Sequence, residues 1–262
     1  MTSPMGKAGA SLQGKTVFLS ASVPNEKRAE RYNRVEDAAF EIEQAVISLA
    51  RAVFSEGGRL VFGGHPAISP LVAMVAGEYR EPRFTESAKE RQSPPVEIYQ
   101  SRAFEGYLPD ETLLMHRLGY ASIHWVDAVD EERYNPNAVS EDVQCTGSLR
   151  RMRETMLEAS HPDAMVCIGG MDGLEDEVAV ALERGRGFPI YVLERTGGAA
   201  ALLRGRHLDQ LRMIDTEIVT HVDLMRAKLN DGERLRETHI RRALVPYPLV
   251  MQTIVEEIAR QS

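Results

Sequence analysis

The segment at residues 163–185, DAMVCIGGMDGLEDEVAVALERG, constrains the fold of this chain more than any other. Ala164–Ile168 is a short apolar run, as expected for a strand buried on both faces of a sheet. An amphipathic segment begins at Leu174. Three glycines lie between the two segments: Gly169, Gly170 and Gly173. We therefore predict a strand, a glycine turn and a helix, whose free backbone N–H groups and dipole converge on a spot that suits a phosphate.

The same turn carries more acidic residues than a simple phosphate site needs. They are Asp172, Glu175, Asp176 and Glu177. Acidic side chains beside a phosphate favour recognition of a ribose or chemistry at the sugar. For Glu175 and Asp176 the simpler interpretation is that acids in the first helical turn complement the helix dipole.

Apolar runs with the length of strands alternate with amphipathic segments along most of the chain. The predicted strands are Thr16–Ser20, Arg59–Phe62, Val96–Gln100, Ser122–Val126, Ala164–Ile168 and Ile190–Leu193. This alternation predicts an α/β fold with a doubly wound, mainly parallel Rossmann-like sheet and helices on both faces. Because no repeat or linker is visible, we expect a disordered segment at 1–14 and one domain at 15–262. We expect the C-terminal extension at 200–262 to be mostly helical.

The composition narrows the class of protein. A net charge of −8 argues against a general binder of nucleic acids or anionic membranes. Cys145 falls in an expected loop and Cys167 in an expected core strand, which favours a reducing compartment over a disulfide framework. No run approaches the ~20 apolar residues of a membrane span, and no signal peptide is visible. We therefore expect a cytoplasmic protein.

Four turns that follow predicted strands are rich in glycine or hydroxyl residues. The carboxyl ends of parallel strands lie along one edge of a sheet, where doubly wound folds bind ligands. Turns in α/β proteins are rich in glycine in any case, but the four together favour a nucleotide-like ligand. The candidate nucleotide-binding residues are Ser20, Ser22, Gly63, Gly64, His65, Ser69, Gly169, Gly170, Met171, Asp172, Gly173, Thr196, Gly197 and Gly198.

Two familiar nucleotide-binding motifs are excluded. The letters GASLQGKT at 9–16 match a Walker A motif, but a P-loop lies between a strand and a helix, whereas this match precedes a predicted strand. The first strand leads to Ser-Ala-Ser-Val-Pro instead of G-x-G-x-x-G, which excludes a conventional dinucleotide dehydrogenase. The histidines show no metal-binding spacing, and of these we retain only His65 as a ligand contact. We expect no metal and no cofactor.

The turn at 168–177 is similar to the P-G-G-x-G-T-x-x-E signature of the Lonely Guy phosphoribohydrolases, which activate cytokinins. More broadly, over about residues 16–200, the chain resembles the SLOG superfamily. That superfamily also includes DprA and nucleotide-sensing domains of bacterial defence proteins and TRPM channels. Ile168 stands in place of the proline and Leu174 in place of the threonine, and one residue is inserted. These departures favour a divergent, sensor-type branch.

The resemblance implies roles for particular residues. It gives the three glycines of the turn a phosphate-binding role and Glu177 the role of the family's catalytic glutamate. The segment RRMRETM at 150–156 resembles the helix that carries the catalytic arginine, which implies that role for Arg153. A carboxylate beneath an oxocarbenium-like sugar stabilises its charge and can orient water. From its charged neighbours alone, Arg153 would instead belong to a solvent-exposed helix face.

Three functions follow from these observations. The first is binding of a nucleotide or nucleotide-derived signal, such as an ADP-ribose-like compound, in a SLOG-type pocket. The second is a nucleoside 5′-monophosphate N-ribohydrolase that releases a free base. The third is a non-catalytic adaptor with a vestigial pocket. We also expect a homodimer or larger homo-oligomer by analogy with the resembled enzymes, and a separate effector protein as a partner. We expect neither nucleic acid nor membrane as a partner.

Overall fold

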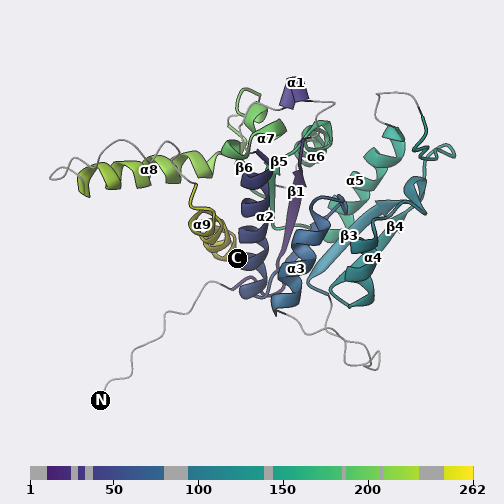
Figure 1. The fold of residues 1–262 in the computed structure, drawn as a ribbon, viewed down its shortest axis with the longest axis horizontal. Coiled ribbons are helices and arrows are strands. Elements are labelled where there is room, and N and C mark those ends of the chain that lie inside the picture. The colour runs from purple at the N-terminus through teal and green to yellow at the C-terminus, as the bar shows by residue number, and fades with distance from the viewer. Residues whose placement is uncertain are drawn as a thin grey trace, which may run out of the picture.

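In the computed structural model, seven strands of the described residues form one parallel sheet in the order β4-β3-β2-β1-β5-β6-β7 (Figure 1). The structure describes residues 11–24, 29–32, 38–79, 94–138, 144–184, 187–206, 209–229 and 245–261. The strands are β1 (Thr16–Ser22), β2 (Arg59–Phe62), β3 (Val96–Ser101), β4 (Ala121–Val126), β5 (Ala164–Gly169), β6 (Ile190–Leu193) and β7 (Leu211–Arg212). The predicted α/β class is confirmed.

The six predicted strands form within two residues of their expected bounds. They were visible in the sequence because a strand covered on both faces is a run of apolar residues. β7 was not predicted, and it lies in the extension that we expected to be mostly helical. Of its two residues only Leu211 is buried, which leaves too short a pattern for a strand to be recognised.

Helices cover both faces of the sheet. On one face lie α2 (Ala38–Ser55), α3 (Ser69–Tyr79), α4 (Asp110–Arg117) and α9 (Tyr247–Arg260), and on the other α5 (Thr146–Ser160), α6 (Asp172–Glu183) and α7 (Gly198–Leu203). β1 contributes side chains to the hydrophobic cores on both faces of the sheet, because Val17 and Leu19 pack toward α2 whereas Phe18 packs toward α5 and α6. The other elements of the described residues are α1 (Ala29–Tyr32), α8 (Ile214–Leu229) and the 3₁₀ helices η2 (Arg102–Phe104) and η3 (Glu194–Thr196).

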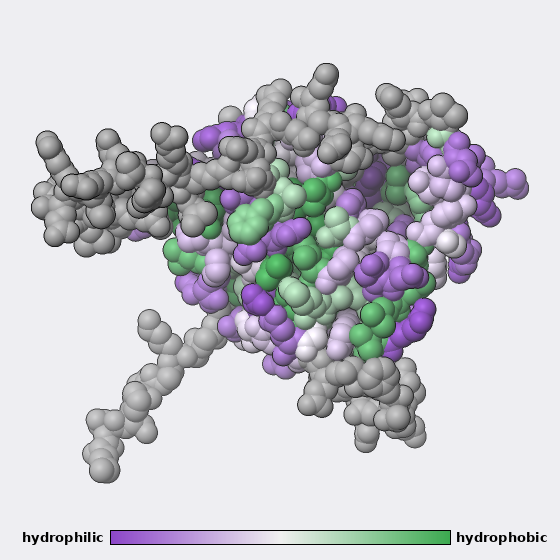
Figure 2. Space-filling view, in the orientation of Figure 1, coloured by the Kyte–Doolittle hydropathy of each residue, from purple (hydrophilic) through white to green (hydrophobic). Residues whose placement is uncertain are grey.

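The outer surface of α2, α3, α4 and α9 carries several exposed apolar side chains. They are Phe40, Met74, Tyr79, Leu114 and Leu249. Figure 2 shows apolar residues on the visible face interspersed with hydrophilic ones. Scattered apolar residues of this kind are normal on a protein surface and do not define an interface.

The C-terminal extension returns to the face that carries α2. Within the described part of residues 200–262, helix predominates, as expected. α9 packs against α2, and the Tyr247 hydroxyl donates a hydrogen bond to Glu41 Oε2 at 2.7 Å. Figure 1 shows α8 extending away from the sheet. None of the helices in the described ranges combines the length and apolar sequence that crossing a bilayer requires.

The ordered chain begins earlier than we predicted. Leu12, placed in the expected disordered segment, is fully buried in the core beside α2, and residues 1–10 lie outside the described ranges. Lys15, the lysine of the rejected Walker-type match, donates a hydrogen bond to the Ile258 carbonyl at 2.8 Å. That contact ties the amino end of β1 to α9, at the sheet edge opposite the one where ligands are expected.

The strand order reverses beside β1, which lies between β2 and β5. The strands β1 to β4 follow one another in one direction across the sheet, and β5 to β7 in the other. At the carboxyl edge, Ser22 of β1 is paired with Gly169 of β5. In doubly wound sheets, the crevice at such a reversal is the usual place for a ligand.

Candidate functional site

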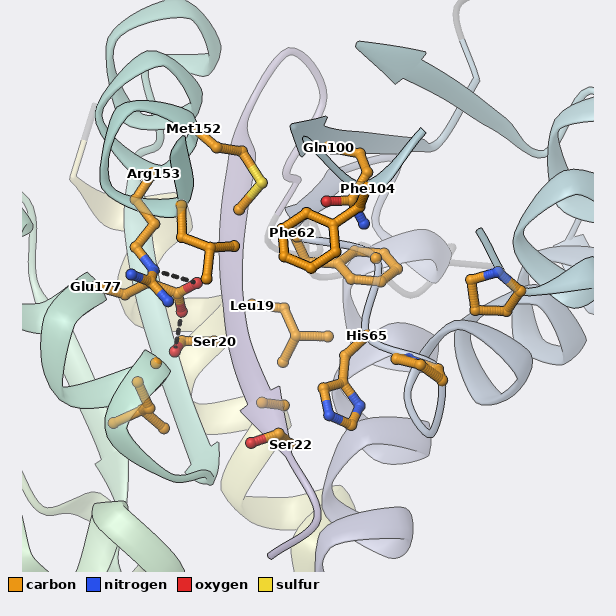
Figure 3. A pocket seen from close by; sticks show the side chains of 18 of the residues that line it. Leu19, Ser20, Ser22, Phe62, His65, Gln100, Phe104, Met152, Arg153 and Glu177 are labelled. Atoms are coloured by element: carbon orange, nitrogen blue, oxygen red, sulfur yellow. Dashed lines mark hydrogen bonds and ion pairs between the residues drawn. The ribbon is translucent and has the colours of Figure 1, made fainter. Parts of the chain in front are cut away.

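A cavity of about 370 Å³ lies at the carboxyl ends of β1 and β2 (Figure 3). Its walls come from β1, β2 and β3, from the loops after β2, η2 and β4, and from α5 and α6. The predicted site residues that line it are Ser20, Ser22, Gly63, Gly64, His65, Arg153, Gly173 and Glu177. In Figure 3 Ser20, Arg153 and Glu177 lie on one side of β1, with Phe62 and His65 on the other.

Ser20, Arg153 and Glu177 form the polar wall of the cavity. The Ser20 hydroxyl donates a hydrogen bond to Glu177 Oε2, and Arg153 Nε lies 3.9 Å from Glu177 Oε1. Ser20 and Glu177 are 157 positions apart and meet because β1 and β5 are neighbours in the sheet. The solvent-exposed interpretation of Arg153 is wrong, because this residue is only 8% exposed.

The Arg153 guanidinium has bonding capacity to spare. Its Nη1 donates to Asp176 Oδ2 at 2.9 Å, but its buried Nε has no hydrogen-bond partner among the described residues. A Cβ on Gly173 would lie 3.2 Å from Arg153 Nη2, so that the glycine leaves room for the guanidinium. A buried donor without an acceptor is costly, and a bound molecule with an acceptor would remove that cost.

The pKa of Glu177 is raised above the ordinary value of a glutamate. Burial is the main cause, and the positive charge of Arg153 and the Ser20 hydrogen bond act against it. An ionised carboxylate with a raised pKa takes up a proton more readily than an ordinary one. The wall therefore offers a carboxylate suited to general-base chemistry.

His65 occupies the turn after β2 as a neutral side chain. The Ala67 backbone N–H donates to His65 Nδ1 at 3.2 Å, and burial lowers the pKa of His65. With Nδ1 acting as an acceptor, the ring proton is on Nε2. Ser69 lies behind this turn, where its hydroxyl donates to the His65 carbonyl at 3.0 Å. Ser69 therefore supports the turn and, contrary to our expectation, does not line the cavity.

The opposite wall is aromatic, and sequence analysis missed it. It contains Phe62, Phe104, Tyr107 and Tyr134. The rings of Phe104 and Tyr134 are stacked with centroids 5.0 Å apart, and Tyr107 meets Tyr134 edge to face at 5.2 Å. Gln100, near the end of β3, also lines this side. Three of these residues follow β3 or β4, so the strand-end rule could have found them, but we searched the turns for glycines and small hydroxyl residues.

The glycine turn after β5 differs from our prediction. Gly169 and Gly170 do not line the cavity, and their backbone N–H groups are not free. Gly169 N–H donates to Thr196 Oγ1 at 2.7 Å, and Gly170 N–H donates to the Ser22 carbonyl at 2.8 Å. Both glycines have positive φ angles, of 61° and 85°, and a Cβ on Gly169 would overlap Ile42. Backbone conformation and packing thus account for them without a phosphate.

The turn after β6 supports its neighbour and does not line the cavity. Thr196 Oγ1, which accepts the Gly169 bond, donates to the Leu193 carbonyl at 2.6 Å. Gly197 and Gly198 both have positive φ angles, of 73° and 60°. The structure thus brings these residues to the predicted sheet edge but outside the cavity wall.

Met171 and Asp172, at the start of α6, also lie outside the cavity wall. Asp172 Oδ1 accepts a hydrogen bond from the Tyr32 hydroxyl at 2.6 Å and forms an ion pair with Arg31 at 3.3 Å. Both partners belong to α1, so these contacts hold α1 against the start of α6. The bonds explain an acidic residue at this position without a ribose.

Comparison with protein-family models identifies the family of this chain. The model of the SLOG cluster3 family matches residues 31–229, about three quarters of the chain. The matched range contains Arg153, Glu177 and the aromatic wall, whereas β1 with Ser20 lies before it. A search of curated proteins finds no match.

Proposed function

Because the chain belongs to the SLOG cluster3 family, we propose that it binds a nucleotide or a nucleotide-derived molecule, such as an ADP-ribose-like compound, in the cavity beside β1. The observation that carries the proposal is that a polar wall and an aromatic wall face each other across one cavity. A nucleotide has the same division, because a polar sugar-phosphate is joined to a flat aromatic base.

The polar wall suits the sugar and the phosphate. The Arg153 guanidinium offers a charged donor, since its Nε makes no hydrogen bond to the described residues, and a guanidinium is well matched to phosphate oxygens. The hydroxyls of Ser20 and Ser22 add groups that can bond to ribose. Gly173 brings the first turn of α6 to the cavity, and the positive end of its dipole favours an anion there.

The aromatic wall suits the base. Aromatic rings gain free energy when a flat ring stacks on them, and a tyrosine keeps a polar edge for hydrogen bonding. The volume of about 370 Å³ lies near the lower end of the range of roughly 300–1,000 Å³ for ligand pockets. This size favours a ligand with a single base.

Thermal denaturation with a panel of mononucleotides and ADP-ribose tests the proposal. A ligand at about 100 times its Kd adds about 2.7 kcal/mol to the free energy of unfolding, which corresponds to a rise in melting temperature of about 5 °C or more. At least one compound of the panel is expected to produce such a rise. If none does at saturating concentration, the proposal fails and the adaptor hypothesis remains.

A pair of conservative substitutions locates the binding. Arg153→Lys keeps a positive charge but removes the buried Nε. The ligand that raises the melting temperature should therefore bind to this variant at least about tenfold more weakly. Arg150→Lys is the control, since Arg150 lies on the same helix but is exposed and pairs with Glu154 and Glu183. Equal affinities in the two variants would place the ligand elsewhere.

The second candidate function is hydrolysis of a nucleoside 5′-monophosphate at its N-glycosidic bond. Glu177 favours it, because a buried carboxylate with a raised pKa lines the cavity and is held by the Ser20 hydroxyl. The ionised carboxylate would stabilise the oxocarbenium-like sugar and take a proton from the attacking water. The water oxygen bonds to C1′ as the bond from C1′ to the base nitrogen breaks, and the proton that Glu177 takes from the water passes to the base.

Release of free base, separated chromatographically from the nucleotide, tests this activity. Glu177→Gln and Arg153→Ala should abolish release, and Glu177→Gln should still bind the nucleotide. If the wild-type protein binds a nucleotide and releases no base, the function is binding alone. The homo-oligomer and the separate effector stay predictions, which light scattering and co-purification can test.

A further inference from the structure

We propose that the cavity selects a base with an oxo group, a 6-oxopurine such as hypoxanthine or guanine, over adenine. The inference rests on the proposed function and narrows it, since it concerns the base that faces the aromatic wall. Its basis is that two side chains on this side, Gln100 and His65, are both held so that they present hydrogen-bond donors. Neither the family match nor the sequence motifs assign a role to Gln100.

The orientation of the Gln100 amide is fixed by the backbone. Its Oε1 accepts a hydrogen bond from the Ser101 N–H at 3.0 Å, and the reversed amide would place a donor against that donor. Nε2 therefore points away from this bond. It lies beside Gly64, where a Cβ would be 3.9 Å from it. Since Gln100 lines the cavity, its amide N–H groups are available to a molecule bound there.

His65 is likewise held so that it presents a hydrogen-bond donor. Its Nδ1 accepts the Ala67 N–H, so the ring proton is on Nε2, and the lowered pKa keeps the ring neutral. Figure 3 shows Gln100 and His65 on the side of β1 opposite Ser20, Arg153 and Glu177. The hydroxyls of the tyrosines can donate or accept, so that discrimination between bases falls on Gln100 and His65.

Donors on the protein require acceptors on the base. A 6-oxopurine presents O6 and N7 along one edge, and both are acceptors. Adenine presents N7 together with the N6 amino group, which is a donor. An amino group placed against the Gln100 amide or the His65 Nε2–H would leave donors facing each other and unpaired, which costs binding free energy.

Isothermal titration of the full-length chain with IMP and AMP tests the selection, because the two nucleotides differ only in the base at and beside C6. IMP should bind at least about tenfold more tightly than AMP. GMP, whose base is also a 6-oxopurine, should likewise bind more tightly than AMP. Equal binding of IMP and AMP, or tighter binding of AMP, overturns this inference and leaves the proposed function standing. Binding of no nucleotide overturns both.

Substitution of Gln100 provides the sharper test. In Gln100→Glu one carboxylate oxygen can still accept the Ser101 N–H, while the other presents an acceptor to the base, so that AMP should now bind as tightly as IMP or more tightly. Gln100→Met removes the Gln100 donors at similar volume and should lower the IMP/AMP ratio, leaving only the preference that His65 confers. Gln44→Glu, an exposed position on α2 outside the cavity, makes the same change of charge and should leave the ratio as in the wild type. An unchanged ratio in both Gln100 variants would contradict the assignment.

Discussion

Two glycine turns stand at the same edge of the sheet, but only one of them borders the cavity. In the turn after β2, a Cβ on Gly63 would approach a single neighbour, the Met152 methyl group, at 3.4 Å. In the turn after β6, a Cβ on Gly198 would lie 2.5 Å from the Gly170 carbonyl oxygen. The space beside Gly63 is open to the cavity, whereas the space beside Gly198 is filled by backbone. A glycine in such a turn therefore indicates that a larger side chain is not needed or does not fit. The neighbouring atoms determine whether its space is open to the cavity or filled by the protein.

The largest expected effect is that of Gly198→Ala on stability. Its φ of 60° costs a residue with a side chain about 1–2 kcal/mol, and the overlap with a backbone atom adds more. We expect a loss of about 3 kcal/mol or more in the free energy of unfolding, measured by urea denaturation.

Gly63→Ala is the matched change in the open turn. Because the added methyl group meets only a flexible side chain, the free energy of unfolding should change by less than about 1 kcal/mol. Because Gly63 lines the cavity, the methyl group is expected to narrow it, and the affinity for a nucleotide bound there should fall. Similar losses of stability in the two variants would remove the distinction between the turns.

A smaller effect is expected for Thr196→Val, which removes the hydroxyl that joins the turn after β6 to the turn after β5. The Gly169 N–H would lose its buried acceptor, and we expect a loss of about 1–3 kcal/mol in the same measurement. Thr196→Ser retains the hydroxyl and should keep most of the stability. If Thr196→Ser retains stability but loses nucleotide binding, this turn contacts the ligand after all.

The smallest effect on stability is expected for Glu177→Gln, and the size of this effect depends on pH. The pKa of Glu177 is raised by burial, so between about pH 4.5 and that pKa the folded state holds more protons than the unfolded state. In the wild type, the stability that protonated Glu177 contributes is therefore lost as pH rises through the pKa that Glu177 has in the folded state. The variant does not titrate, so its melting temperature should exceed that of the wild type by a margin that grows as pH rises from about 4.5 through the raised pKa of Glu177.

Glu78→Gln serves as the control for this prediction, because the pKa of Glu78 is shifted in the opposite direction to that of Glu177. Arg51 lowers the pKa of the exposed Glu78 by hydrogen bonding, so loss of this charge should not stabilise the protein at any pH. If Glu177→Gln melts below the wild type at pH 8, the ion pair with Arg153 outweighs burial. The polar wall would then be a structural cluster.

Much of the fold could be read from the sequence. Ala164–Gly169 is recognisable because every residue of the strand is buried, and the glycines after it mark a turn. β7 could not be read, because Leu211 and Arg212 are too few for a pattern. Leu12 was assigned to the disordered segment at 1–14 because its neighbours are small or polar, yet it is fully buried in the core.

The candidate site was predictable only in part. Glu177 and Arg153 were identified by resemblance, and the structure brings both to one wall of the cavity. The sequence alone argued for an exposed Arg153, because charged neighbours surround it along the chain. The aromatic wall depends on loops after β3 and β4, whose conformations are set by packing between Phe104, Tyr107 and Tyr134.

The sequence by itself determined where the strands and turns lie and that the turns share an edge, since burial and backbone conformation leave local patterns. Only the tertiary structure decided which turn opens onto a cavity. The bond from Gly169 to Thr196 closes one turn, and the bond from Ser20 to Glu177 assembles a wall of the cavity. Both join residues far apart in the chain, and no local pattern encodes which distant group a backbone N–H or a hydroxyl will meet.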